Sequence, residues 1–398
     1  MAVLAFVTFG IRLSFAVFFA EFVANEGWSN EAAAGIFSIS MLVFALGSTP
    51  AGILLDKFGA RIVFTSGVLV LAVGLLLSSQ AQSVAQLTLY YGIVAGSGVA
   101  MVGLGPIAAN IATWIPPTRR GRAIGLAFAG TGLGSLIFVP LSSQLIAQFG
   151  WRASYAILAG ICFFFLAPLL FITLRPAPKN MKHATQTSTH QAFSVRDSWR
   201  NLRSNPVFWL LMLVALTAMG PLRALTVHQI AYIESVGISR QVAANYVGLA
   251  GFLTAGTYIM WGFVSDKWGR AVAFGSGALC LLGAVAILVL LGNMSIAMLL
   301  VPYAVLYALA EGTRSSQTTA LASDIFQKNG LGLVNGMVGA MFGLGAAFAP
   351  WIVGRLRDQT DSYLLGFAIV VGMVIISLVA FILVSIQSSS KIDNKRKN

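Results

Sequence analysis

The chain has 398 residues, of which 58% are hydrophobic and only 9% are charged, and it carries a formal net charge of +13. A soluble protein of this length has no interior large enough for so much apolar side chain, so the composition excludes a soluble protein and predicts an integral membrane protein. The apolar runs are long and continuous rather than alternating with period 2, which argues against a β-barrel and for an all-α membrane fold.

The apolar runs predict twelve transmembrane helices in two sets of six. In chain order they cover about 1–24, 30–55, 62–79, 86–113, 121–147 and 152–174, then 206–235, 241–265, 271–291, 295–322, 331–354 and 363–385. The first helix begins almost at Met1, so either the chain is trimmed or its true start lies upstream. We expect bundles over 1–174 and 206–386, a polar, basic linker over 175–205, and a basic tail over 387–398.

Basic residues gather in alternate loops, which accounts for the net charge. They are Lys57, Arg61, Arg119, Arg120, Arg122, Arg175, Lys179, Lys182, Arg196, Arg200, Arg203, Lys267, Arg270 and Lys328, with Lys391, Lys395, Arg396 and Lys397 in the tail. By the positive-inside rule these loops and both termini face the cytoplasm. The charge therefore indicates topology in a lipid bilayer, and we expect no nucleic-acid partner.

A short charged motif occurs twice, at the ends of the second and eighth helices. Residues 52–61 read GILLDKFGAR and residues 262–270 read GFVSDKWGR, so that Asp56 and Asp266 are 210 positions apart. The same offset joins further residues of equal type, namely Gly10 and Gly220, Gly27 and Gly237, Ser29 and Ser239, Gly59 and Gly269, and Pro140 and Pro350. A fixed offset of this kind predicts that the second half repeats the first.

Two six-helix halves joined by this doubled motif resemble the major facilitator superfamily of secondary transporters. The resemblance implies alternating access between two pseudo-symmetric halves, and a conformational latch at the cytoplasmic face formed by Asp56, Arg61, Asp266 and Arg270. Gly27-Trp28-Ser29, the run over 119–127 and the segment from His228 to Ser239 most resemble the bacterial monocarboxylate transporter and oxalate–formate exchanger branch. Many members of that branch carry a basic residue in helix 8 or 11, and here neither helix core has one.

Three arginines interrupt apolar helices near their centres: Arg12, Arg223 and Arg314. Each would cost about 2.5–3.5 kcal/mol if it faced lipid, so each must face water, a counter-charge or a ligand. The family fold implies that the helices that carry them line the central cavity. We expect these arginines to bind substrate, with a tether to a neighbouring helix as the alternative for Arg12.

The tenth helix carries a polar stripe at helical spacing. The stripe consists of Tyr303, Tyr307, Glu311, Arg314 and Thr318. Glu311 and Arg314 are three residues apart and are predicted to pair. Either the pair only neutralises itself, or Arg314 binds an anion while Glu311 takes a proton or releases Arg314. Three arginines against one glutamate leave two surplus positive charges, which favours a small anion, and guanidinium groups bind carboxylates in bidentate fashion.

Other polar and aromatic residues complete the predicted site. Phe15 and Phe19 share a face with Arg12 and suit an apolar tail, and the Tyr91 hydroxyl is a further candidate contact. His228 is a proton-coupling candidate or a neutral, hydrogen-bonded histidine, and its position about 140° around the helix from Arg223 means that the two contact different ligand atoms. Glu21 is expected at a solvated outer helix end, with proton coupling as the alternative.

The sequence thus predicts a transporter of a small organic anion, most simply a monocarboxylate, in a bacterial inner membrane, driven by proton symport or anion exchange. The alternative is a multidrug exporter of the same fold, although cation efflux would favour surplus acids in the cavity. A transporter-like sensor or an intramembrane enzyme is the remote alternative, because His-Glu-x-x-His and Gly-x-Ser-x-Gly motifs are absent. Cys162 and Cys280 have no metal-ligand spacing, no cofactor is implied, and no oligomer is indicated.

Overall fold

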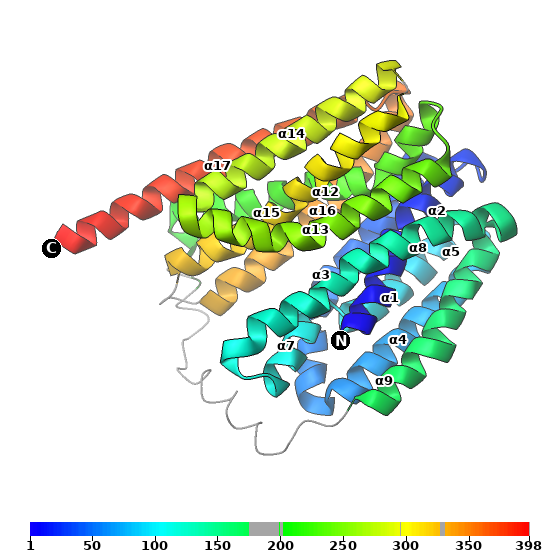
Figure 1. Ribbon diagram of the computed structural model, residues 1–398, viewed down its shortest axis with the longest axis horizontal. Helices are drawn as coiled ribbons and strands as arrows, with labels where there is room; N and C mark the ends of the chain where they lie inside the picture. Colours follow the sequence, from blue (N-terminus) through cyan, green and yellow to red (C-terminus); the bar gives the residue numbers. More distant parts are fainter. Residues whose placement is uncertain (175–198, 200–201, 295, 327–330, 398) are drawn as a thin grey trace.

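The computed structural model describes residues 1–174, 199, 202–294, 296–326 and 331–397, and among these residues it contains helices and no strand. The first half consists of α1 (Ala2–Leu13), α2 (Phe15–Ala24), α3 (Asn30–Phe58), α4 (Ala60–Ser78), α5 (Val84–Leu87), η1 (Thr88–Ala95), α6 (Gly96–Met101), α7 (Leu104–Trp114), α8 (Pro117–Gly160), η2 (Ile161–Leu166) and α9 (Ala167–Thr173). The second half consists of α12 (Pro206–Ser235), α13 (Arg240–Trp268), α14 (Arg270–Met294), η4 (Ala297–Leu299), α15 (Leu300–Phe326), α16 (Leu331–Thr360) and α17 (Leu364–Lys397). Figure 1 shows the two halves as adjacent bundles, the first coloured blue to green and the second green to red.

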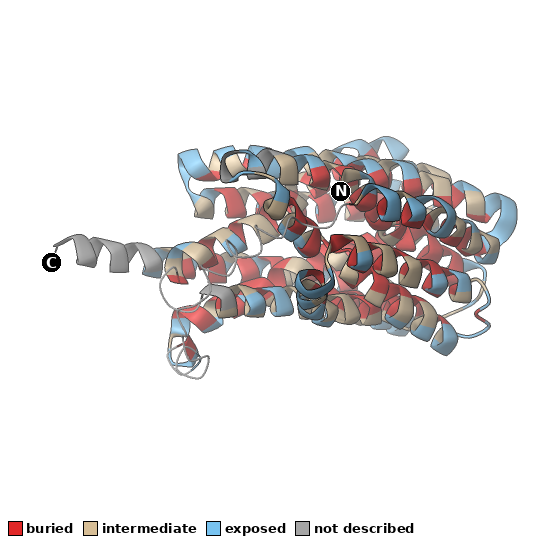
Figure 2. Ribbon diagram, turned by 90° about the horizontal axis from the view of Figure 1, so that it is seen from below, coloured by how far each residue is buried: buried red, intermediate tan, exposed pale blue. Residues whose placement is uncertain are grey.

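The surface of the described part is that of a membrane protein. Large apolar side chains are exposed on the outside of the bundles, such as Phe164 at 79% and Ile172 at 77%. Buried residues lie along the inner faces of the helices in both halves (Figure 2). Because water would penalise these exposed side chains and lipid does not, the outer faces suit a bilayer.

Ten helical segments of the described chain are long and apolar enough to cross a bilayer. One of them, over 123–173, has 51 residues and would be about 75 Å long as a straight helix, far more than one crossing needs. Gly150 lies inside it with φ 77°, and the chain reverses direction within α8 at this kink (Figure 1). The α15 helix is not among the ten, since polar residues such as Glu311 and Arg314 lower its hydropathy. The number of crossings therefore stays a prediction of twelve.

The repeat appears as matching local geometry in the two halves. Ser29 and Ser239 each cap the following helix with the side-chain oxygen, at Ala32 N and Val242 N. The preceding Gly27 and Gly237 both have positive φ, and so do Gly59 and Gly269 of the doubled motif, a conformation that glycine adopts without steric cost. We call the helix ends near Gly27 and Gly237 the turn end, and those near Gly59 and Gly269 the hinge end.

Three helix pairs make the main contacts between the halves, namely α3 with α16, α8 with α13 and α2 with α12. The backbones approach closely toward the turn end, where a methyl group on Gly354 would lie 2.6 Å from the Asn30 carbonyl oxygen and one on Gly248 would lie 3.1 Å from that of Ser135. A methyl group built on the glycines nearer the hinge end would have no described atom within 4 Å. These glycines are Gly125, Gly256, Gly262, Gly336 and Gly339. The close backbone contacts between these helix pairs thus lie toward the turn end.

Some helices depart from the predicted continuous rods. The first predicted helix is broken at Ser14, just after Arg12. The predicted helix over 86–113 is divided into four segments, one of them the π-helical η1 that carries Tyr91, and π segments often occur at functional sites. The predicted linker over 175–205 lies mostly outside the described residues, and α17 continues to Lys397 through the predicted tail.

Candidate functional site

An ion pair joins two helices of the second half near the middle of the bundle. The guanidinium of Arg223 on α12 contacts the carboxylate of Glu311 on α15, and the two side chains are 16% and 14% exposed. Arg12 of the first half lies within electrostatic range of both Arg223 and Glu311, as well as of Tyr91. We call Arg12, Arg223 and Glu311 the central charge group.

Arg12 is held by neighbours that leave its charge unneutralised. Its Nη2 lies 2.9 Å from the Met41 sulfur, and its guanidinium carbon lies 4.2 Å from the centre of the Phe44 ring and 5.6 Å from that of Phe9. A thioether is a weak acceptor and a ring face attracts a cation without cancelling its charge. No carboxylate among the described residues contacts Arg12, so it is a partly exposed, unpaired cation. Arg12 is therefore tethered to a neighbouring helix, and its binding of substrate stays a prediction.

The predicted pairing of Glu311 with Arg314 is wrong, because Glu311 pairs with Arg223 instead. Arg314 is fully buried, donates from Nη1 to the Ser377 hydroxyl oxygen at 3.0 Å, and lies 4.8 Å from the Phe274 ring centre. Residues three apart share a helix face but diverge by about 60°, so one side chain reaches α12 while the other turns toward α14 and α17. The structure does not bring Arg314 to the central charge group, and its role in anion binding stays a prediction.

This arrangement changes the charge balance inferred from the sequence. Arg223 is neutralised by Glu311, and Arg314 is sealed from solvent. The positive charge left accessible within the central charge group is that of Arg12 alone. The surplus is therefore one charge, not two.

Tyrosines surround the ion pair. The Tyr307 hydroxyl lies 2.7 Å from Thr226 Oγ1 and 3.3 Å from the Leu222 carbonyl oxygen, so it is buried behind the pair. Tyr258 on α13 was not predicted; it is 39% exposed and interacts electrostatically with both Arg223 and Glu311, while its hydroxyl bonds Ser315. A tyrosine in the middle of an apolar helix was the signal that could have revealed it.

The predicted aromatic wall lies on the turn-end side of Arg12 and is closed. Phe15 and Phe19 are fully buried. Phe15 packs against Tyr91, with ring centres 5.0 Å apart, and Phe19 meets the edge of His228 at 4.7 Å. Phe19 thus contacts the second half through His228, whereas Phe15 packs within the first half, and neither ring faces an open cavity in this conformation.

His228 is a buried member of the same layer. Its Nε2 lies 2.9 Å from the Pro350 carbonyl oxygen, and its Nδ1 has no partner in the described part of the chain. The ring also contacts Phe19 and Tyr363, and the expectation that His228 and Arg223 bind different ligand atoms stays a prediction. The geometry favours a neutral, hydrogen-bonded histidine, and proton coupling through His228 stays a prediction.

The turn end is closed by a carboxylate of one half that caps a helix of the other. Asp358 on α16 accepts hydrogen bonds from the backbone N–H groups of Asn30 and Glu31 at 2.9 and 2.7 Å, and from Asn30 Nδ2 at 2.8 Å. The Tyr363 hydroxyl adds a bond to Asn30 Oδ1 at 3.2 Å. A negative charge at the first turn of α3 satisfies free N–H groups and complements the helix dipole.

A second contact across the halves involves Glu21. The Arg240 guanidinium contacts Glu21 of the other half, and its Nε lies 3.0 Å from Glu234 Oε2. The expectation that Glu21 is solvated is therefore wrong, because the neighbouring half brings Arg240 to it. Glu21 is engaged in closing the turn end, and its proton coupling stays a prediction.

The predicted latch residues at the hinge end lie in separate halves. Arg270 binds Asp324 of its own half, with Nη2 3.0 Å from Oδ1, and Arg61 lies 3.9 Å from the Phe171 ring centre. Asp56 and Asp266 are exposed. No contact among these residues joins the halves in the described structure, so the latch stays a prediction.

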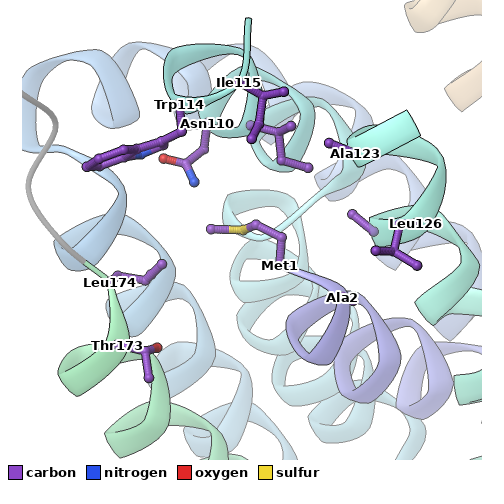
Figure 3. A pocket seen from close by; sticks show the side chains of 11 residues that line it. Met1, Ala2, Asn110, Trp114, Ile115, Ala123, Leu126, Thr173 and Leu174 are labelled. Carbon is purple, nitrogen blue, oxygen red and sulfur yellow. The ribbon is translucent and has the colours of Figure 1, made fainter. Parts of the chain in front are cut away.

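A cavity of about 430 Å³ lies at the hinge end of the first half, away from the central charge group. Its lining consists of Met1, Ala2, Asn110, Ile111, Trp114, Ile115, Ala123, Leu126, Ala127, Thr173 and Leu174. Figure 3 shows the Met1 side chain directed into it, facing Asn110 and Trp114. Its lining has no charged side chain. The described residues also contain no group of three metal-ligating side chains.

The model of the Major Facilitator Superfamily matches residues 1–313 and 224–398 of the chain. The chain belongs to this superfamily. It is therefore a multi-pass membrane protein of the facilitator fold, with the transporter architecture predicted from the doubled motif.

Relatives of this superfamily member include monocarboxylate transporter 13 of Bos taurus, 30% identical over 378 residues, which cover 91% of this chain and 82% of the relative. The oxalate:formate antiporter of Oxalobacter formigenes is 29% identical over 276 residues, covering 68% and 64%. Among solved structures, a nucleoside transporter has a TM-score of 0.78 at 13% identity over 96% of this chain and 98% of its own. A bacterial homologue of the lysosomal transporter Spinster, in an inward-facing and occupied conformation, has a TM-score of 0.72 at 16% identity, covering 96% and 95%. The structural likenesses show the fold.

Proposed function

We propose that this facilitator-superfamily protein is a secondary active transporter of a small monocarboxylate. The observation that carries the proposal is the unpaired guanidinium of Arg12 in the middle of its span, where the neighbouring Arg223 is already neutralised by Glu311. In a poorly hydrated site one free positive charge favours a ligand with one negative charge, and a guanidinium binds a carboxylate with two parallel hydrogen bonds. Phe9, Met41 and Phe44 beside Arg12 suit a short apolar tail.

The relatives support a carboxylate substrate by name, and the monocarboxylate transporters among them name the proposed class. Monocarboxylate transporters and an oxalate:formate antiporter are both similar to most of this chain. Arg12 would bind the carboxylate, while Tyr258 would lie near the opposite side of the ligand. Phe19 would separate from His228 of the second half when the turn end opens, and Phe15 and Tyr91 behind it would then reach the ligand.

Movement would follow alternating access between the halves. The basic loops assign the hinge end and both termini to the cytoplasm of a bacterial inner membrane. In that orientation the closed turn end faces outward, and we interpret the structure as the inward-facing conformation. Return to the outward-facing state would break the Asp358 cap and the Arg240–Glu21 pair.

Two kinds of coupling fit this site. With a bound monocarboxylate the central charge group has no net charge, whereas the empty group carries one positive charge in the membrane interior. That difference in charge favours a change of conformation with an anion bound over one with the site empty. A transporter that changes conformation only when loaded carries out anion exchange. In proton symport, Glu311 is the group we assign to the proton, because a carboxylate released from Arg223 gains one readily.

Export of cationic drugs is the weaker alternative. A cation would meet the unpaired Arg12, and the carboxylate of Glu311 is already engaged by Arg223. No feature of the described structure favours a sensor.

A thermal-shift screen of the detergent-purified protein tests the proposal. A ligand that binds only the folded state raises its melting temperature, so we expect stabilisation by short monocarboxylates and none by cationic drugs. Arg12→Gln should abolish the stabilisation. Arg152→Gln, which removes an exposed arginine at the turn end, is the matched control and should keep it. Stabilisation by cations alone, or an Arg12→Gln protein that responds like the wild type, would contradict the proposal.

A further inference from the structure

The central charge group contains two arginines and one carboxylate, and the carboxylate is bound to only one of the arginines. We infer that Glu311 determines the charge of the substrate: by occupying Arg223, it restricts the site to monoanions and excludes dianions. This inference rests on the proposed function, since it assigns a selectivity to the same site.

The geometry makes Glu311 the sole counter-charge of this group in the described structure. Arg12 and Arg223 each interact with one acidic side chain, and for both arginines it is Glu311. The other groups that interact with Glu311 are the phenols Tyr258, Tyr303 and Tyr307, which carry no charge when protonated. Arg314 faces Ser377 and Phe274 and adds nothing to the balance. The group therefore has a net charge of one.

Electrostatics then selects the ligand. A monocarboxylate on Arg12 brings the group to zero charge. A dicarboxylate would leave one negative charge uncompensated, unless it displaced Glu311 from Arg223. Displacement would strand the Glu311 carboxylate in a site that is mostly closed to water, and an unpaired buried charge is strongly unfavourable. Rejection of a dianion thus comes from a built-in competitor rather than from the size of the site.

Removal of this competitor should change the selectivity, not merely weaken binding. With Glu311→Gln, Arg223 and Arg12 both become available, one from each half. Two guanidinium groups within electrostatic range of each other favour a ligand that carries two carboxylates. We therefore expect Glu311→Gln to gain dicarboxylate binding.

The experiment compares acetate, propionate, oxalate and succinate as inhibitors of labelled monocarboxylate exchange in proteoliposomes at pH 8, where all four are fully ionised. The wild type should be inhibited by the monocarboxylates and not by the dicarboxylates. In Glu311→Gln the ratio of dicarboxylate to monocarboxylate affinity should rise by about tenfold or more. Glu311→Asp, which keeps the charge, should keep the wild-type ratio. Thermal shifts on the same proteins supply binding data if Glu311→Gln binds without transporting.

A compensating pair of substitutions tests the inference independently of that variant. Arg12→Gln alone leaves a neutral group and should bind neither class. Arg12→Gln combined with Glu311→Gln frees Arg223, restores a net charge of one, and should regain monocarboxylate binding. The inference is overturned if Glu311→Gln keeps the wild-type ratio, or if the double variant stays as inactive as Arg12→Gln while remaining folded.

The outcomes separate this inference from the proposed function. If no carboxylate binds the wild type, the proposed function fails. If the wild type binds monocarboxylates and loses them in Arg12→Gln, but neither Glu311 variant behaves as expected, the proposed function stands and the role of Glu311 in selectivity fails.

Discussion

The two halves of this transporter share a scaffold and differ in how each holds its arginine. Arg12 of the first half lies beside Met41 and Phe44, without a carboxylate. Arg223 of the second half is bound to Glu311. The helix caps and glycine turns are nearly the same in both halves, so the repeat accounts for the frame, and the charge difference between the halves accounts for the binding chemistry that we propose.

The repeat shows where this difference arises in the sequence. Arg12 and Arg223 are 211 positions apart, one more than the offset of the repeat, so they occupy almost equivalent positions in the first and seventh predicted helices. The position equivalent to Glu311 in the first half is Met101. The first half therefore has the arginine but not its counter-charge, and the site is left with one unpaired cation.

The largest effect should come from giving Arg12 a carboxylate of its own. The Met41 sulfur already lies 2.9 Å from Arg12 Nη2, so Glu at this position should pair with Arg12 and make the first half resemble the second. We expect Met41→Glu to weaken monocarboxylate binding by about a hundredfold or more, because the ligand must compete with a tethered carboxylate. Isothermal titration of the purified variant measures this loss.

Met41→Gln is the matched control, since it has nearly the same shape as Glu and no charge. It should bind monocarboxylates within about threefold of the wild type. Equal loss of binding in both variants would mean that the shape around Arg12, and not its free charge, governs the site.

A second prediction concerns the third arginine. Arg314 is buried beside Phe274 and Ser377, and two of its nitrogens, Nε and Nη2, have no partner in the described part of the chain. Replacement of a buried charge by an apolar side chain of similar length is often neutral or stabilising by about 1–4 kcal/mol. We expect Arg314→Met to keep monocarboxylate binding and to unfold at the same or a higher temperature, as measured by differential scanning fluorimetry with and without ligand.

Arg314→Met also tests the prediction from the sequence that Arg314 binds the substrate. If the variant folds but no longer binds carboxylates, Arg314 belongs to the substrate site. That result would contradict our assignment of carboxylate binding to Arg12 and not to Arg314. Ser377→Ala, which removes the hydrogen-bond partner and keeps the arginine, should leave binding unchanged in either case.

The sequence predicted the scaffold well, because its signals are local. Apolar runs located the helices, and the fixed offset paired Ser29 with Ser239, which both cap helices in the structure. The pairing of Glu311 was predicted wrongly, since helical spacing tells which residues share a face but not which neighbouring helix that face meets. Arg223 is 88 residues from Glu311, and such a contact depends on helix packing. The same holds for Asp358, which caps a helix 328 residues away.

The two seams between the halves provide the final comparison. Related by the repeat, the α3–α16 and α8–α13 seams close the turn end differently. Both α3 and α13 have a serine cap of their own, but α3 is also capped by Asp358 of the opposite half, whereas α13 contributes Arg240 to Glu21. The negative charge at the first turn of α3 should therefore stabilise the closed turn end specifically, and loss of an N-terminal cap costs about 0.5–2 kcal/mol.

Asp358→Asn should consequently open the turn end more often. Hydrogen–deuterium exchange of the α3 N-terminus in nanodiscs should become about fivefold faster, as expected for a loss of roughly 1 kcal/mol. Asp361→Asn is the matched control, because Asp361 lies three residues away with a side chain that is 97% exposed and paired only to Arg357 among the described residues. It should leave the exchange unchanged. Equal exchange in both variants would mean that the Arg240–Glu21 contact and the packed aromatic layer keep the turn end closed without the cap, and that the two seams are equivalent after all.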